Sequence, residues 1–183
     1  MKPRINVEEY NPEWAQIFES LKEKIWPVVK DIAIAVEHVG STSVPGLAAK
    51  PVIDMDVVVD SADFSRAAVT QLQKLGYSPL GEKGIPGREA FRRPADSPRH
   101  HLYVCLKSSL AFKNHIVFRN FLRENKEASM QYADLKMRLA EEYAGDSDTY
   151  CEAKTAFILK ILENDGFSKA ELLAVKGANI VKR

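Results

Sequence analysis

The sequence predicts an α+β fold, in which a mixed β-sheet flanked by helices is followed by a helical C-terminal part. In an opening segment and in the C-terminal part, apolar residues recur at three- and four-residue steps, as they do in amphipathic helices. Between these segments, short β-prone runs alternate with turns rich in glycine and proline. We therefore expect an α/β core over residues 1–107 and a helical part over residues 108–183, packed on the core as one compact unit.

The first helix is expected to begin at Asn11-Pro12-Glu13, because asparagine caps helices and proline suits their first turn. Its buried stripe consists of the apolar residues Trp14, Phe18, Leu21, Ile25 and Val28. A strand at Ala33–Val39 then leads into a glycine turn. A second strand at Val52–Val59 is apolar except for two acids, which is typical of a central strand covered on both faces.

The middle of the chain alternates in the same way. Ser61 can cap a helix that Gly76 would stop. Tyr77–Leu80 is expected to form a third strand, and residues 81–99, rich in glycine, proline and arginine, a hairpin or mobile loop. The strand His101–Leu106 follows, and the helical pattern begins after it.

The composition excludes several classes of protein. The chain has 183 residues, 45% hydrophobic and 28% charged, with a net charge of +1. A long nucleic acid normally requires a basic excess, so a small-molecule partner is favoured. No apolar run approaches the ~20 residues of a membrane span, so we expect no membrane association and a cytoplasmic location. Cys105 and Cys151 lie in periodic apolar segments and are expected to be buried thiols.

Residues 40–56, GSTSVPGLAAKPVIDMD, carry the main chemical signal. Asp54 and Asp56 lie two apart on a strand and so share a face, where they repel each other unless a cation or proton holds them. The preceding turn, Gly40–Ser43, offers backbone and hydroxyl donors for an anion. Two carboxylates that hold Mg²⁺ (or Mn²⁺) beside a phosphate site suit nucleotidyl transfer. A tight turn followed by an incidental acid pair would give the same pattern.

The segments His38–Leu47 and Lys50–Asp56 resemble the GrpB family, which is grouped with the nucleotidyltransferase superfamily and its DNA polymerase β-like fold. The likeness covers nearly the whole chain, continuing through Tyr10–Trp14, His101–Val104, Phe118–Arg123 and Tyr150–Ile158. The resemblance implies a nucleotidyltransferase-like sheet. It also implies a phosphate-holding turn at Gly40 and Ser41 and metal carboxylates at Asp54 and Asp56.

Active members of that superfamily usually add a third carboxylate from a later strand. Here the matching strand reads His100-His101-Leu102-Tyr103-Val104 and contains no acid. His101 could ligate a metal or act as a base, because the ordinary pKa of histidine lies near neutrality. A histidine that is only hydrogen-bonded at the edge of the site is an equally good interpretation.

Basic side chains complete the candidate phosphate site. We expect phosphate contacts from the turn residues Gly40, Ser41, Thr42 and Ser43 and from the basic residues Lys50, Arg92, Arg93 and Lys154. Lys136 and Lys154 each follow a tyrosine by four residues, and related nucleotidyltransferases supply such side chains to the triphosphate. Lys154 is expected to be the less exposed of the two. Solvated loop arginines, and lysine stems lying on their own helices, would give the same patterns.

Three functions follow from these residues. The first is a metal-dependent nucleotidyltransferase that moves a nucleotidyl group from a nucleoside triphosphate to a small acceptor, using Asp54, Asp56 and His101. The alternative is a non-catalytic module that binds a nucleotide or phospholigand and has lost the third carboxylate. A third hypothesis is a metal-dependent hydrolase in which His101 helps to activate water. The sequence leaves the acceptor, the base preference and the oligomeric state open.

Overall fold

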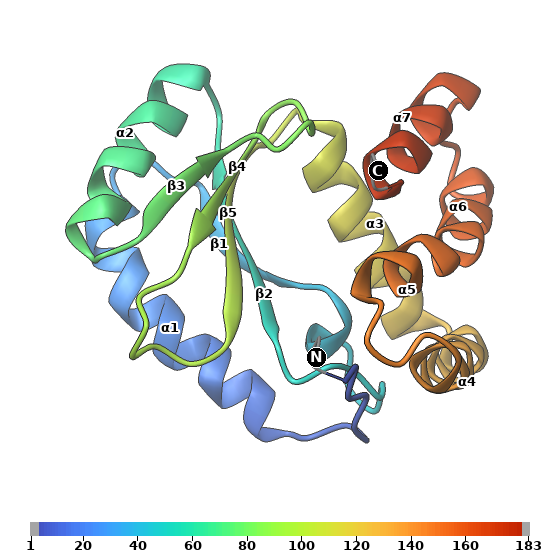
Figure 1. Ribbon diagram of the computed structural model, residues 1–183. Coiled ribbons are helices and arrows are strands. Elements are labelled where there is room, and N and C mark those ends of the chain that lie inside the picture. The colour runs from blue at the N-terminus through green and yellow to red at the C-terminus, as the bar shows by residue number, and fades with distance from the viewer. Residues whose placement is uncertain (1–3, 181–183) are drawn as a thin grey trace.

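The computed structural model describes residues 4–180 and consists of a five-stranded mixed sheet with helices on both faces (Figure 1). The strands are β1 Ala35–Val39, β2 Ile53–Val59, β3 Ser78–Gly81, β4 Arg88–Arg92 and β5 His100–Leu106. The helices are α1 Glu13–Val29, α2 Ala62–Lys74, α3 Leu110–Glu124, α4 Lys126–Glu142, α5 Ser147–Ala153, α6 Thr155–Asn164 and α7 Lys169–Asn179. The predicted α+β class with a mixed sheet is confirmed. The division of the chain at residue 107 stays a prediction.

The strand order is β1-β2-β5-β4-β3, so β2 and β5 lie inside the sheet. β2 runs parallel to β5, whereas the β1–β2, β4–β5 and β3–β4 pairs are antiparallel. The register of the parallel pair places Asp54 opposite His101 and Asp56 opposite Tyr103. Because alternate residues of a strand share a face, these four side chains lie on one face of the sheet.

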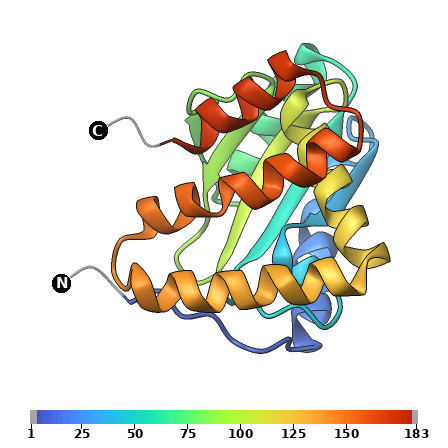
Figure 2. The ribbon, with the colours of Figure 1, turned by 90° about the vertical axis from the view of Figure 1, so that its right-hand side faces the viewer.

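That face is covered by α3–α7, and the opposite face by α1 and α2 (Figure 1). Viewed from the helical side, α4 and α6 cross in front of the strands (Figure 2). The main hydrophobic core lies on the α1–α2 side, where Met55 and Val57 of β2 and Leu102 and Val104 of β5 are buried. The sheet therefore separates the main apolar core from a face that carries acids, histidines and a tyrosine.

Most predicted element boundaries agree with the structure. Ser61 Oγ accepts a hydrogen bond from the Phe64 N–H at 3.2 Å, so it caps α2 as expected. The Asn11 side chain accepts from the Glu13 N–H at 2.9 Å, although Pro12 occupies the N-cap position. At the end of α1 the buried residue is Val29 rather than the predicted Val28, because the stripe continues at a four-residue step from Ile25.

The segment 81–99 contains the strand β4, which forms a hairpin with β3 and pairs with β5. Its glycine- and proline-rich loop therefore supplies a strand to the sheet, and the hairpin alternative is confirmed.

None of the helices within residues 4–180 combines the length and apolar character that crossing a bilayer requires.

The buried histidine of β1 makes the stability of the fold depend on pH. His38 stacks on Phe18 with ring centroids 4.5 Å apart, and its Nε2 lies 3.0 Å from Thr42 Oγ1. Burial lowers the pKa of His38 from 6.5 to about 4, although the charge of Asp54 opposes this shift. The unfolded chain therefore takes up a proton first as the pH falls below 6.5, and stability is lost between pH 6.5 and 4.

We predict that this histidine contributes about 3 kcal/mol to the loss of unfolding free energy between pH 7 and pH 4. Denaturant unfolding of the wild type and of His38→Gln at both pH values measures the contribution. His38→Gln should be less stable at pH 7 but should lose less stability on acidification. Equal losses in the two proteins would contradict the prediction.

Candidate active site

The turn before β2 approaches the first acid so closely that only glycine fits. Gly40 has a φ of +69°, and a Cβ atom placed there would lie 2.3 Å from Asp54 Oδ2. Both the backbone conformation and the contact therefore require a residue without a side chain. The glycine predicted to hold phosphate thus also sets the position of the Asp54 carboxylate.

The three hydroxyls of the turn have different surroundings. Thr42 Oγ1 donates to the Val52 carbonyl at 3.4 Å and contacts His38, and Ser43 Oγ donates to the Gly40 carbonyl at 2.6 Å. These two side chains are buried and hold the turn together. Among residues 4–180, no partner engages the partly exposed Ser41 hydroxyl, which leaves it available to a ligand.

Asp54 is bound to the histidine that the sequence places on the neighbouring strand. His101 Nδ1 donates to Asp54 Oδ1 at 2.8 Å, and this hydrogen bond raises the pKa of His101 despite partial burial. The Asp54 side chain is 30% exposed and that of His101 58%, so both reach solvent. The structure therefore brings these two predicted residues together at an accessible point of the sheet.

Asp56 is fully buried and pairs with a histidine that sequence reasoning did not select. His115 of α3 donates from Nδ1 to Asp56 Oδ2 at 2.8 Å. Burial is the largest single influence and lowers the pKa of His115, but the charge and hydrogen bond of Asp56, together with the charge of Asp54, outweigh it, so the pKa is raised. Asp56 Oδ1 has no hydrogen-bond partner within the described chain, although it is shielded from water. An acceptor left in this state requires a cation or a donor from outside.

His115 belongs to a polar stripe on α3, together with Arg119 and Arg123. Arg119 donates to Glu37 Oε2 at 2.7 Å and to the His38 carbonyl at 2.9 Å. Arg123 donates twice to the Ser43 carbonyl, at 3.0 and 2.7 Å. The three residues are spaced by four, so each points to the same side of the helix. This four-residue spacing is the sequence signal that could have indicated a helix in contact with both the turn and Asp56.

Two lysines share one aromatic ring in the helical part. Lys50 Nζ lies 4.1 Å, and Lys154 Nζ 4.4 Å, from the centroid of the Tyr150 ring. Burial is the main cause that lowers the pKa of both amines, while the charge of Asp54 acts on Lys154 in the opposite direction. Like charges gathered beside a carboxylate favour the binding of a further anion. We call Lys50, Tyr150 and Lys154 the lysine–tyrosine cluster.

The prediction that Lys154 would be less exposed than Lys136 is wrong. Lys136 is 2% exposed, and its Nζ donates to the Ala48 carbonyl and lies over the Tyr132 ring. Burial lowers its pKa to about 7, and Lys154 adds to this effect. Lys136 therefore ties α4 to the segment after the turn, whereas Lys154 remains partly exposed.

The two arginines expected at the phosphate site have different surroundings. Arg92 is exposed at the end of β4, opposite Ser78. Arg93 donates to carbonyl groups of its own loop, including that of Ser97 at 2.7 Å. A third arginine, Arg88, lies on the site face with its guanidinium 4.5 Å from the Tyr103 ring centroid.

The two cysteines differ, contrary to the prediction that both are buried. Cys105 is buried on β5, where burial and the nearby Asp56 raise the pKa of its thiol. Cys151 is exposed on α5, next to the lysine–tyrosine cluster. The apolar neighbours of each cysteine in the sequence do not distinguish the two positions, because Cys105 lies on an inner strand and Cys151 on the exposed side of a short helix.

The donor set at the acids fits a divalent cation that is brought by a phosphate ligand. Within residues 4–180, no cluster of three or more histidine, cysteine, aspartate or glutamate side chains is arranged to hold a metal. Mg²⁺, however, is commonly bound by one or two carboxylates together with waters and substrate phosphates. The unpartnered Asp56 Oδ1, beside the accessible Asp54, supplies such a set.

The family model described as GrpB protein matches residues 4–164. The chain belongs to the GrpB family. It is 34% identical over 163 residues to the UPF0157 protein YqkA of Bacillus subtilis (strain 168), covering 89% of this chain and 48% of that protein, so it spans about half of this relative. The crystal structure of conserved protein GrpB from Enterococcus faecalis superposes with a TM-score of 0.76 at 36% identity, covering 94% and 98% of the two chains.

More distant solved structures place the fold in a wider group. The Cid1 poly(U) polymerase with bound MgGTP has a TM-score of 0.51 at 16% identity, over 74% of this chain and 44% of that one. At this identity the likeness shows the fold alone. The sheet of this GrpB family member is therefore nucleotidyltransferase-like, as the resemblance implied.

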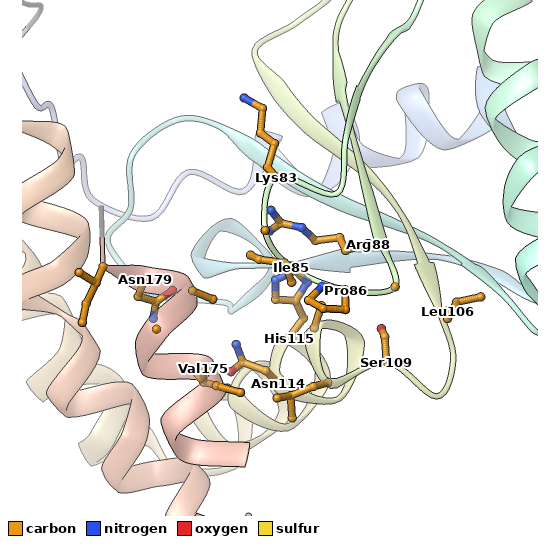
Figure 3. Close-up of a pocket in the computed structure, with 18 of the residues that line it drawn as sticks. Lys83, Ile85, Pro86, Arg88, Leu106, Ser109, Asn114, His115, Val175 and Asn179 are labelled. Carbon is orange, nitrogen blue, oxygen red and sulfur yellow. The ribbon is translucent and has the colours of Figure 1, made fainter. Parts of the chain in front are cut away.

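Two cavities lie beside residues that contact the acids or the turn. The larger, about 1340 Å³, lies between the 82–87 loop, α3 and α7, and His115 forms part of its wall (Figure 3). The smaller, about 390 Å³, is lined by His38, Thr42 and Ser43 on the other side of the turn. Each cavity is therefore lined in part by residues that contact Asp56 or belong to or contact the turn.

Replacing Gly40 tests its contact with Asp54. Gly46 is the matched control, because its φ is +79° but nothing lies within 4 Å of a Cβ placed there. Gly46→Ala should cost about 1–2 kcal/mol from backbone strain alone. Gly40→Ala should cost about 1–3 kcal/mol more, because its ψ of −174°, at a positive φ, lies in a region that glycine almost alone adopts and because the methyl group must displace the Asp54 carboxylate. Denaturant unfolding of both variants gives the comparison, and equal costs would contradict the close approach.

Proposed function

We propose that this GrpB family member transfers a nucleotidyl group from a nucleoside triphosphate to a small acceptor. The observation that carries the proposal is the placement of Asp54, which is accessible, beside a buried acid and near the lysine–tyrosine cluster. Acids that suit a cation and amines that suit phosphates are thus brought together from the sheet and the helical part. A nucleotide with its metal ion satisfies both.

The proposed roles follow from the contacts. The Ser41 hydroxyl and the amines of Lys50 and Lys154 would hold the phosphates distal to the sugar and neutralise the departing pyrophosphate. Asp54 and Asp56 would hold Mg²⁺ (or Mn²⁺), which supplies charge stabilisation at the attacked phosphorus and at the leaving group. Lys136 of α4 donates to the Ala48 carbonyl and so holds the helical part against the segment after the turn.

In this proposal, His101 accepts the proton of the acceptor. Its Nδ1 is fixed by Asp54, which leaves Nε2 as the free ring nitrogen at an exposed position. In the proposed reaction, a nucleophilic atom of the acceptor attacks the α-phosphorus and loses its proton to Nε2. The bond from the α-phosphorus to the bridging oxygen breaks, and pyrophosphate leaves with the electron pair.

We predict that a nucleoside triphosphate with Mg²⁺ raises the melting temperature by roughly 5–10 °C at about 100 times the dissociation constant. Asp54→Asn should abolish this shift, because one metal-holding carboxylate is lost. Asp60→Asn is the control, since Asp60 is an exposed acid just beyond β2. Thermal denaturation with each of the four triphosphates provides the measurement. Absence of a shift with all four, with either Mg²⁺ or Mn²⁺, would overturn the proposal.

A non-catalytic phospholigand-binding module is the second candidate, and the pairing of the acids favours it. Asp54 and Asp56 already accept hydrogen bonds from His101 and His115, as carboxylates without a metal would. This candidate predicts that a nucleoside triphosphate stabilises the protein equally with Mg²⁺ and with a chelator. Lys154→Met should remove the stabilisation in both conditions. A strict metal requirement would exclude this candidate.

A further inference from the structure

The larger cavity contains a buried donor that no described residue satisfies. Arg88 Nε is shielded from solvent and has no hydrogen-bond partner within residues 4–180. The guanidinium is held by stacking on Tyr103, and Figure 3 shows its side chain beside His115 and Ile85 at the wall of the cavity. A buried guanidinium N–H without an acceptor is costly, and a carboxylate or phosphate group matches the guanidinium in charge and shape.

The other polar side chains that line the cavity also suit an anionic ligand. Lys83, Asn114 and Asn179 line it from the loop, α3 and α7, and Asp148 is the one acid in the lining among residues 4–180. Two full positive charges against one negative charge favour an anionic ligand. The amides can take up hydroxyl or amino groups of the same molecule, because each offers both donors and an acceptor.

The walls of this cavity are fixed. The Gly87 N–H donates to Glu82 Oε1 at 2.7 Å, and the Leu106 N–H donates to the Gly87 carbonyl at 2.9 Å. On the far side, Lys113 of α3 pairs with Glu171 of α7 at 2.7 Å. The space between loop and helix is therefore held open by specific contacts.

The cavity also lies at the right distance from the acids. Asp56 is opposite Tyr103 on β5, while Arg88 is opposite Cys105 on the far side of the same strand. Two strand spacings and a two-residue offset put the Cα atoms of Asp56 and Arg88 roughly 12 Å apart. A small metabolite spans this distance, and His115 contacts both the cavity and Asp56.

We propose that this cavity binds the acceptor, and that the acceptor is a small molecule with a carboxylate or phosphate group at the end that Arg88 holds. The assignment rests on the proposed transfer reaction for the acceptor role, but the anion site at Arg88 stands on its own contacts. The nucleophilic end of the molecule then lies toward His115 and the two acids.

The test follows the side-chain Nε–H signal of Arg88 by NMR in the wild-type protein. Inorganic phosphate and succinate are the probes, and the signal of exposed Arg92 is the internal control. We expect a saturable shift at Arg88 with at least one probe and none at Arg92, and the probe that acts identifies the anionic group. Arg88→Gln should weaken binding of that probe about ten- to hundredfold.

A second variant blocks the cavity without touching Arg88. Nothing lies within 4 Å of a Cβ placed at Gly177, which lines the cavity from α7. Gly177→Phe should therefore fill the space and abolish the shift, while Ala170→Phe, on an exposed part of the same helix, should leave it unchanged.

The outcomes separate this inference from the proposed function. If Arg88 responds to neither probe in the millimolar range while a triphosphate with Mg²⁺ still stabilises the protein, the acceptor site is overturned and the transfer reaction stands. If Arg88 responds but no triphosphate binds, the anion site stands, while the transfer reaction and the acceptor role are overturned. Persistence of the shift in Gly177→Phe would place the anion outside the cavity and overturn the assignment.

Discussion

The parallel hydrogen bonding between β2 and β5 is the constraint on which the arrangement of this protein depends. It places Asp54 against His101 and Asp56 against Tyr103, so one ladder positions these four polar side chains of the site face. A slip by one residue would turn the acids into the apolar layer under α1 and α2. The buried Met55 and Val57 on that opposite face exclude the slip, because they would then face the histidines.

A second layer of contacts connects this ladder to the helices. The polar stripe of α3 reaches Asp56, the backbone beside β1 and the turn with three successive side chains, and Lys136 of α4 reaches the segment after the turn. These bonds join charged donors to buried acceptors, and such bonds are individually stronger than neutral ones. The helical part is therefore fixed by polar contacts at the acids and turn and by apolar packing around them.

The sequence was sufficient for the local parts of this arrangement. The glycine turn, the two acids on one strand face and the histidine strand could be predicted, because each follows from spacing within a short segment and from the family likeness. Contacts between distant segments could not. His115 and Asp56 lie 59 residues apart in the sequence. The four-residue spacing on α3 marks one face of that helix, but nothing local identifies Asp56 as the partner of His115.

The same reason explains the misjudged lysines and the surroundings of the arginines. Lys136 and Lys154 have identical spacing to a tyrosine, but only Lys136 meets the Ala48 carbonyl, which a different part of the chain supplies. Arg93 lies in an arginine-rich loop, which suggested a contact with phosphate. Its guanidinium instead donates to carbonyl groups of that loop. The acceptor that a long basic side chain contacts depends on which carbonyl and carboxylate groups the fold leaves unpaired. The set of unpaired acceptors is a property of the whole structure.

The contrast between the two thiols has a practical consequence. Cys105 is buried with its pKa raised, so it should resist reagents that attack thiolates, whereas Cys151 is open to solvent beside the amines of Lys50 and Lys154. The native chain thus provides one solvent-accessible cysteine thiol, Cys151, at the edge of the lysine–tyrosine cluster. A fluorophore attached there would report on occupancy of the amines without any engineered residue.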